Sequence, residues 1–239
     1  MYFESKNTVL GSDTDTNANL SILAALQKLQ DNICFFFGSI GLDQITLKEK
    51  YHAAWIFSKN KLKIFKNIGW NQTLNIKSFI SSVSAVKIIV DTIFTDQNDD
   101  AILYSRIEMC LVDLDSQRIK RIADVGITSE LVQPSIIDFE PTRLSPIDDL
   151  RLMTQRTVYT TNLDMSMHTN NVEYVRFLLD TIDLDTLKNK EVSDIEINYL
   201  KETTYLDNLA IFSKNIDDEY YFEIKKEDSV LRAKISFRA

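Results

Sequence analysis

Hydrophobic and polar positions follow two different periods along the chain, and their order predicts a helix followed by strands. Residues 20–37 (LSILAALQKLQDNICFFF) place apolar side chains at helical spacing, which predicts one long, mostly buried helix with Asn19 as its N-cap. β-Branched and aromatic residues with partial period-two alternation then predict four strands, at residues 55–65, 74–83, 85–96 and 101–115. The first part of the chain is therefore expected to hold one helix against an antiparallel sheet.

The same order of elements returns in the second half of the chain. A short strand is expected at residues 156–161 and a helix at residues 170–182. Four further strands are then expected, at residues 192–203, 207–215, 220–226 and 230–237. The letters IFSKN occur in both halves, in WIFSKNKLKIF and in LAIFSKN, which is a weak echo of the repeated order. This repetition predicts an α+β fold, a double hotdog, in which two tandem units each wrap an antiparallel sheet around a central helix.

All three prolines of the chain fall within residues 133–146, where the sequence reads QPSIIDFEPTRLSP. Proline lacks an N–H donor and has a fixed φ angle, so this stretch is not expected to form a regular element. We therefore expect an N-terminal hotdog at residues 1–130, a linker at residues 131–150 and a C-terminal hotdog at residues 151–239.

Composition argues against several classes of function. The formal net charge is −8, which disfavours broad binding to the phosphates of a nucleic acid. Only five glycines occur, too few in the right places for the glycine-rich loops that cradle nucleotide phosphates. No run approaches the roughly 18 apolar residues of a membrane span, and the N-terminus lacks the pattern of a signal peptide. We expect a soluble, cytoplasmic protein with no nucleic-acid or membrane partner.

Residues able to bind a metal are few. Cys34 and Cys110 lie far apart in apolar surroundings, which predicts buried, reduced thiols rather than a disulfide or a metal pair. The chain has two histidines, and neither belongs to an HExxH motif. We expect no metal and no cofactor, and we assign His52 a structural role.

The stretch LDMSMHTNNVEYVRF, residues 163–177, holds the other histidine, His168. Asp164 lies four residues before it, and Asn170 and Asn171 follow it as good N-cap residues for the expected helix. A helix N-terminus offers backbone N–H groups and a partial positive charge, which suit a thioester carbonyl that becomes an oxyanion. Asp164 is able to accept a hydrogen bond from the imidazole and fix its tautomer. The alternative is a surface loop in which His168 packs or caps and the acids are solvated.

This stretch resembles the D-x-N-x-H-x-N-N-x-x-Y signature of the acyl-acyl-carrier-protein thioesterases of plants and bacteria. The signature positions are carried here by Asp164, Ser166, His168, Asn170, Asn171 and Tyr174, and all but Ser166 match. The similarity continues in EINYLKET (196–203), where the family has a strand that ends in a glutamate, here Glu202. In the first half, LQKLQDNICFFFGSIGL looks like the family's buried helix and AAWIFSKNKLKIFKNIGWNQTLNIKSF looks like strands that follow it. The resemblance thus covers most of the chain.

The resemblance implies hydrolysis of the thioester between a fatty acyl group and the phosphopantetheine arm of an acyl carrier protein. It also implies that the N-terminal hotdog holds the acyl chain in a tunnel and that the C-terminal hotdog supplies the catalytic groups. Glu202 is expected to act as a general base on water, and His168 to polarise the substrate or protonate the leaving thiol. Asp164 is expected to orient the site, and amides near Asn170 and Asn171 to bind the substrate and stabilise the oxyanion.

Departures from the family pattern keep rival functions open. Ser166 stands where the family has asparagine, so one hydroxyl replaces an amide with two donor hydrogens. Thr203 follows Glu202, so no cysteine is available there as a nucleophile, and water attack is favoured over an acyl-enzyme on Ser166. The rival functions are a coenzyme A thioesterase of hotdog fold and a non-catalytic acyl-binding module.

An acyl carrier protein is usually acidic, so a chain with a net charge of −8 needs a local basic patch to dock it. The candidates for such a patch are Arg118, Lys120, Arg121, Arg143, Arg151 and Arg156. We expect a monomer or a weak homodimer, because two tandem hotdogs already form the pair that single-domain relatives make by dimerising.

Overall fold

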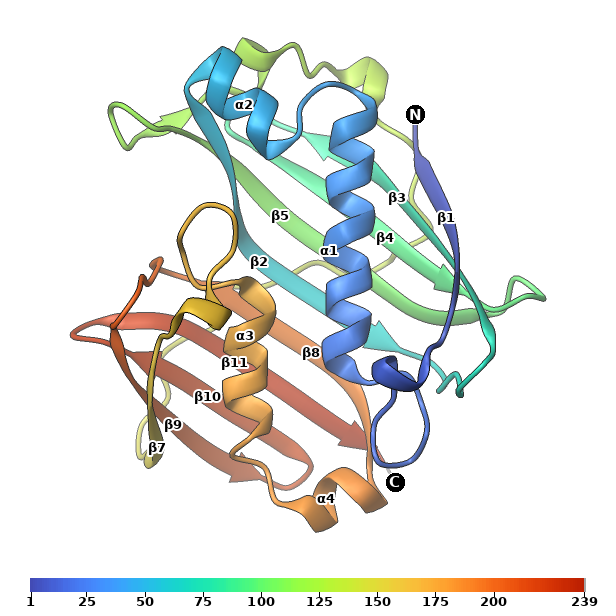
Figure 1. Ribbon diagram of the computed structural model, residues 1–239, viewed down its shortest axis with the longest axis vertical. Helices are drawn as coiled ribbons and strands as arrows, with labels where there is room; N and C mark the ends of the chain where they lie inside the picture. The colour runs from blue at the N-terminus through green and yellow to red at the C-terminus, as the bar shows by residue number, and fades with distance from the viewer. Residues whose placement is uncertain (239) are drawn as a thin grey trace. The chain divides into compact units, whose positions relative to one another are not determined.

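The structure is a computed structural model that describes residues 1–238, and it divides into two compact units (Figure 1). One unit spans Met1–Pro141 and the other spans Thr142–Ala239. Each unit contains one antiparallel sheet and one principal helix. None of the helices within residues 1–238 is both long enough and apolar enough to cross a membrane.

The principal helix of the first unit, α1, spans Ile22–Ser39. Ser21 caps it, because its Oγ accepts a hydrogen bond from Ala24 N at 3.2 Å. The buried apolar residues of α1 recur at helical spacing and are Ala24, Ala25, Leu26, Leu29, Ile33, Phe36 and Phe37. The helix expected from the sequence is confirmed, but the expected N-cap is wrong. Asn19 belongs to the preceding loop, where it forms a β-bridge with Gly69.

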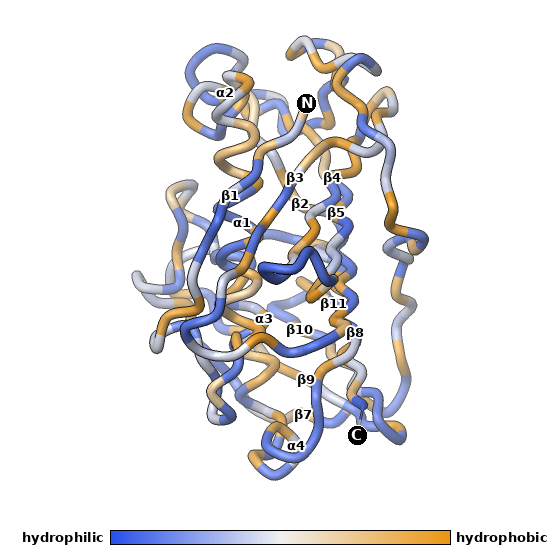
Figure 2. Tube along the Cα trace, turned by 90° about the vertical axis from the view of Figure 1, so that its right-hand side faces the viewer, coloured by the Kyte–Doolittle hydropathy of each residue, from blue (hydrophilic) through white to orange (hydrophobic). Residues whose placement is uncertain are grey.

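The sheet of the first unit has the strand order β1, β3, β4, β5, β2, and all neighbours are antiparallel. The bounds are Phe3–Thr8 for β1, Ala53–Ile64 for β2, Thr73–Val83 for β3, Lys87–Thr95 for β4 and Ala101–Asp113 for β5. A short strand, β6 (Ile119–Lys120), pairs with β5. The four long strands were expected. Strand β1 was not, because it is largely hydrophilic (Figure 2).

A second helix of this unit, α2, spans Gln44–Tyr51 and is capped by Asp43, whose Oδ1 accepts hydrogen bonds from Ile45 N and Thr46 N. His52 ends the helix in a left-handed conformation, with a φ angle of 48°. Its side chain is exposed and its Nδ1 lies 3.7 Å from a carboxylate oxygen of Asp115. His52 is therefore the C-cap residue of α2, and its purely structural role stays a prediction.

Polar side chains form a row across the interior of the first unit. Ser78, Thr92 and Ser105 lie opposite one another on β3, β4 and β5 and are fully buried. Ser78 Oγ accepts a hydrogen bond from Asn32 Nδ2 on α1 at 2.8 Å and lies 2.9 Å from Thr92 Oγ1. At the other end, Ser105 Oγ donates to Asn60 Oδ1 at 2.9 Å. The row satisfies its hydrogen bonds internally, which is the condition for burying polar groups in a core.

The second unit repeats the arrangement with the strand order β8, β11, β10, β9, β7. The bounds are Arg151–Thr157 for β7, Glu191–Tyr199 for β8, Asn208–Ile216 for β9, Glu219–Lys225 for β10 and Ser229–Arg238 for β11. Its helices are α3 (Asn171–Leu179) and α4 (Leu184–Asn189). The strand expected at residues 156–161 ends earlier, because residues 160–162 turn into a 3₁₀ helix.

Residues 132–150 form neither a helix nor a strand, as the prolines predicted. In the first unit, this segment is held by Arg106 on β5. All three guanidinium nitrogens of Arg106 donate, to both carboxylate oxygens of Asp91, to Ser135 Oγ, to Phe139 O and to Glu140. The side chain of Arg106 is only 8% exposed, and that of Asp91 is fully buried. A bidentate, buried ion pair therefore anchors the proline-rich segment to the sheet.

One smaller expectation is wrong, that of buried thiols, and one weak similarity between the two halves has no structural counterpart. Cys34 is exposed on α1 and Cys110 is half-buried on β5, so neither thiol lies in the core. Apolar neighbours in sequence misled the prediction for Cys34, because adjacent residues on a helix point in different directions. The shared letters IFSKN lie on β2 and β9, which hold different places in the two strand orders. They do not mark the structural repeat.

Candidate active site

The loop before α3 is closed by hydrogen bonds of its own backbone. Asp164 N donates to His168 O at 2.9 Å, and Met167 N donates to Asp164 O at 3.1 Å. Met167 adopts a left-handed conformation with a φ angle of 65°, which completes the turn. The side chain of His168 is therefore held on a tight turn and not on a flexible loop.

A buried cluster attaches this turn to the loop that follows β8. Thr169 N donates to Thr203 O at 2.8 Å, and His168 forms a β-bridge with Thr204. The Thr203 hydroxyl lies 2.7 Å from the Thr169 hydroxyl and 2.8 Å from Tyr174 OH. Burial raises the pKa of the Tyr174 phenol, which therefore stays neutral. Thr203 is fully buried, so it anchors its neighbour Glu202 and is not presented to a substrate.

These contacts bring His168 and Glu202 together. His168 Nε2 lies 3.4 Å from Glu202 Oε2, and the two side chains are 37% and 56% exposed. Water and a substrate are thus able to reach both groups. An imidazole and a carboxylate in this arrangement are able to take a proton from water and to pass one to a leaving group.

Asp164 has a different position from the one expected. Its Oδ1 accepts a hydrogen bond from Ser166 N at 2.8 Å. Within residues 1–238, no hydrogen bond joins the Asp164 carboxylate to the imidazole of His168. The carboxylate therefore stabilises the turn, and it influences His168 through the backbone and not by fixing the tautomer of the ring.

Asn170 is the N-cap of α3, as predicted. Its Oδ1 accepts a hydrogen bond from Val172 N at 2.9 Å, and its carbonyl oxygen accepts one from Glu173 N at 2.9 Å. Asn171 is the first residue of the helix. Among the first three amides of α3, that of Asn171 is the one with no partner in the part of the chain that the structure describes. It is the candidate donor for an oxyanion.

Large apolar side chains lie close in sequence to the pair and are exposed. Met165 and Met167, on the His168 loop, are 72% and 66% exposed, and Tyr205 and Leu206, on the Glu202 loop, are also exposed. Exposed apolar groups of this kind are typical of a surface that receives an apolar ligand or a partner. No group of three or more His, Cys, Asp or Glu side chains within residues 1–238 is placed to hold a metal ion.

The first unit contains the same loop without the histidine. Asp15 N donates to Asn19 O at 2.8 Å, and Ala18 N donates to Asp15 O at 3.1 Å. Ala18 has a φ angle of 59°, close to that of Met167, and Asn19 forms its β-bridge with Gly69. Every one of these contacts has its counterpart in the second unit.

The correspondence pairs Asn19 with His168 and, two residues before the bridging partner, Asn67 with Glu202. The first unit therefore carries two amides where the second carries an imidazole and a carboxylate. Sequence reasoning missed this repeat, because the loops read DTNAN and DMSMH and share only the first letter. The similarity lies in the backbone hydrogen bonds, which many sequences are able to form.

Comparison with protein families gives a match over nearly the whole chain. The model described as the acyl-ACP thioesterase N-terminal domain matches residues 1–130, and that of the acyl-ACP thioesterase C-terminal domain matches residues 148–238. The oleoyl-acyl carrier protein thioesterase of Coriandrum sativum is 22% identical over 200 residues, which cover 77% of this chain and 53% of that protein. An acyl-[acyl-carrier-protein] hydrolase of Cuphea viscosissima is 20% identical, with 84% and 50% covered. The chain spans about half the length of these curated relatives.

Solved structures match over the full length of the chain. An acyl-ACP thioesterase from Bacteroides thetaiotaomicron has a TM-score of 0.90 at 18% identity, covering 99% of this chain and 98% of that chain. The 12:0-ACP thioesterase from Umbellularia californica has a TM-score of 0.90 at 17% identity, covering 99% and 97%. At these identities the likeness shows the fold, and the tandem hotdog expected from the sequence is confirmed.

Proposed function

Because the chain belongs to the acyl-ACP thioesterase family, we propose that it hydrolyses fatty acyl-acyl-carrier-protein thioesters to a free fatty acid and the carrier protein. The observation that carries this proposal is the distance of 3.4 Å between His168 Nε2 and Glu202 Oε2, in a site that solvent reaches. The acyl carrier protein enters the proposal as partner because the relatives named above act on its thioesters.

In the proposed reaction, water attacks the thioester carbonyl carbon. Glu202 accepts a proton from this water, and the Asn171 amide donates a hydrogen bond to the carbonyl oxygen as it becomes negative. The carbon–sulfur bond then breaks. The proton held by Glu202 passes to His168 Nε2, 3.4 Å away, and His168 donates it to the leaving phosphopantetheine thiolate. One water is consumed, and one carboxylic acid and one thiol are released.

The remaining signature residues have supporting roles in this proposal. Asp164 and Ser166 stabilise the turn that carries His168, through the hydrogen bond between Ser166 N and Asp164 Oδ1. Asn170 stabilises the first turn of α3 and thereby the position of the Asn171 amide. Thr203 fixes the loop that carries Glu202, because its buried hydroxyl is hydrogen-bonded to Tyr174 OH.

The proposal assigns the acyl chain to the first unit. Phe36 and Phe37 of α1 are buried in its interior, whereas Phe35 is exposed and stacks on Phe3. Burial supports Phe36 and Phe37, and not Phe35, as the aromatic residues that would limit the length of an acyl chain; the alternative is that both are ordinary core residues.

Carrier docking is assigned to basic side chains without an acidic partner. Lys120, Arg121 and Arg156 form ion pairs with Asp113, Asp124 and Asp180. Arg118, Arg143 and Arg151 are exposed and have no acidic partner within residues 1–238. These three are the better candidates for contacts with an acidic carrier.

The test is steady-state hydrolysis of one acyl group presented on the carrier protein and on coenzyme A. We expect the carrier thioester to be cleaved with the higher kcat/KM. His168→Ala and Glu202→Gln should each lower kcat by about two orders of magnitude or more, the size of a lost acid–base group. Ser166→Asn, which restores the family's residue, measures what this departure changes.

Other outcomes identify the rival functions. Preference for coenzyme A thioesters would make the protein a coenzyme A thioesterase. Acyl binding without cleavage, with activity appearing only in Ser166→Asn, would make it an acyl-binding module. Hydrolysis that survives both His168→Ala and Glu202→Gln would exclude this site as the catalytic one.

A further inference from the structure

The second unit repeats the arginine clamp of the first unit, but it leaves the clamp incomplete. Arg106 and Asp91 lie opposite each other on β5 and β4, and Arg232 and Glu223 lie opposite each other on β11 and β10. Each pair faces a part of the segment 132–150, so the two arginines hold equivalent places in their own units.

Arg232 makes fewer hydrogen bonds than Arg106. Its Nε donates to Glu223 Oε1 at 3.0 Å, and its Nη1 reaches Leu144 O at the long distance of 3.4 Å. Its Nη2 has no acceptor within residues 1–238, although the side chain is only 17% exposed. Within residues 142–238, nothing replaces the serine and glutamate oxygens that complete the shell of Arg106. The guanidinium is therefore left with N–H groups that only solvent satisfies, and an acceptor in the neighbouring cavity is able to take the place of that water.

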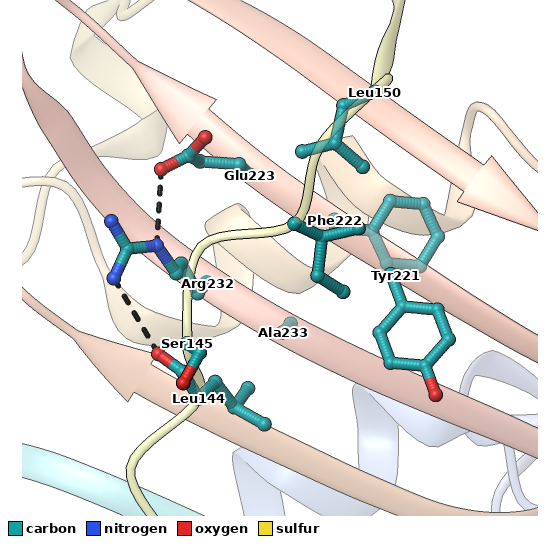
Figure 3. A pocket seen from close by; sticks show the side chains of 9 residues that line it. Leu144, Ser145, Leu150, Tyr221, Phe222, Glu223, Arg232 and Ala233 are labelled. Atoms are coloured by element: carbon teal, nitrogen blue, oxygen red, sulfur yellow. Dashed lines mark hydrogen bonds and ion pairs between the residues drawn. The ribbon is translucent and has the colours of Figure 1, made fainter.

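A cavity of about 210 Å³ lies beside this arginine (Figure 3). The segment 144–150 crosses β10 and β11 above it, and the dashed lines in Figure 3 join Arg232 to Glu223 and Leu144. The cavity is lined by Leu144, Ser145, Ile147, Leu150, Tyr221, Phe222, Glu223, Arg232 and Ala233. Its walls are therefore mainly apolar, with one guanidinium at the edge. Neither His168 nor Glu202 is among the lining residues.

The charges at this edge favour a single negative charge. Glu223 is already neutralised, because it pairs with Arg232 through Oε1 and with Lys225 Nζ through Oε2 at 3.0 Å. These three side chains together carry one positive charge. A monoanion balances that charge, whereas a phosphate dianion would leave one negative charge without a partner.

We propose that this cavity binds a short carboxylate with an apolar chain, whose carboxylate accepts hydrogen bonds from Arg232 and whose chain contacts Leu144, Ile147 and Leu150. Arginine recognises carboxylates through its planar fork of donors, and the apolar wall excludes small hydrophilic anions. The volume lies below the range of about 300–1,000 Å³ that is usual for drug-sized ligands, so a chain of few carbons fits best. The assignment rests on this cavity and holds whether or not the protein is a thioesterase.

The probe is hexanoate, titrated by calorimetry and by ¹H–¹⁵N spectra of the full chain. We expect saturable binding, with the amide shifts concentrated at residues 144–150, 221–223 and 232–233. Arg232→Lys keeps a cation for Glu223 but removes the fork, and it should weaken binding at least about tenfold, the size of one lost charge-assisted hydrogen bond. Ile147→Trp, which fills the cavity and leaves the ion pair intact, should abolish binding.

Matched controls locate the site. Ile136→Trp makes the same change in the exposed part of the segment within the first unit and should leave binding unchanged. His168→Ala should also leave it unchanged. Hexan-1-ol, which has the chain without the charge, should bind at least about tenfold more weakly. The proposal is overturned by the absence of saturation, by equal binding of hexan-1-ol, by binding that survives Ile147→Trp, or by binding that is lost in His168→Ala.

Discussion

The two units build the same loop and fill it with different chemistry. In the first unit, the turn from Asp15 to Asn19 forms its β-bridge with Gly69. In the second, the turn from Asp164 to His168 makes the same backbone bonds with distances that agree within 0.1 Å. The loop therefore forms without an imidazole or a carboxylate at its centre. The backbone hydrogen bonds stabilise the loop, so the side chain of His168 is not needed for its fold and is available for catalysis.

The interiors of the two units also differ, but here the first unit has the polar side chains and the second has the apolar ones. The polar row of the first unit consists of Ser78, Thr92 and Ser105. When the ion pair Asp91–Arg106 is matched with Glu223–Arg232, the residues next to these pairs match as well, and the row corresponds to Ile211, Ile224 and Leu231 in the second unit. All of these side chains are fully buried. The unit with the titratable pair at its surface thus has the apolar row, and the unit with two amides there has the polar row.

The largest effect is expected from making the second loop like the first. His168→Asn places an amide where the first unit has Asn19, and we expect it to lower kcat by about two to four orders of magnitude, the range of acid–base catalysis. Stability should change by less than about 0.5 kcal/mol, as for other surface substitutions. Enzyme assays and urea unfolding measure the two quantities. Asn19→Ala is the matched control and should leave kcat within about twofold; a larger loss would show that the first loop takes part in the reaction.

The next effect concerns the two arginine clamps. Arg106→Met leaves Asp91 buried without its partner, and it should lower the free energy of unfolding by about 3–5 kcal/mol. Arg232→Met should lower it by less, because Arg232 is more exposed and makes fewer hydrogen bonds. Urea unfolding of both variants decides this. An equal or larger loss for Arg232→Met would contradict the view that the second clamp is incomplete.

The smallest effect concerns the buried rows. Ile224→Thr introduces into the second unit the residue that the first has at this place, but between Ile211 and Leu231 its hydroxyl has no partner. The unpaired hydroxyl should lower the free energy of unfolding by about 1–3 kcal/mol. Thr92→Val is the matched change in the first unit, and it should have the smaller effect because Ser78 keeps its bond from Asn32. Thermal unfolding measures both variants. An unchanged melting temperature for Ile224→Thr would show that the new hydroxyl finds a protein acceptor or a water in the second unit, and would contradict the prediction.

The spacing of apolar residues along the chain was sufficient to predict the long helix and the long strands. Helix α1 and strands β2 to β5 carry enough apolar residues at a regular spacing to show their period. Strand β1 and the short helices α2 and α4 were missed, because they have few apolar residues and are stabilised by pairing and by caps. The sequence was compatible with Ser21 as the N-cap of α1, but Asn19 is also a favoured N-cap residue, so the sequence alone did not decide between them.

At the candidate active site, too, some features were predictable from the sequence and others were not. The sequence by itself determined which groups are present: the signature around His168, the glutamate at 202, the serine at 166 and the cap at Asn170. Only the tertiary structure placed His168 beside Glu202, turned the Asp164 carboxylate toward Ser166 N, and matched the loop DTNAN with DMSMH. The reason is physical. Residue types and their spacing are written along the chain. His168 meets Glu202 through backbone hydrogen bonds between segments far apart in it, and both loops are closed by hydrogen bonds of their own backbone; such bonds leave almost no mark on the choice of side chains.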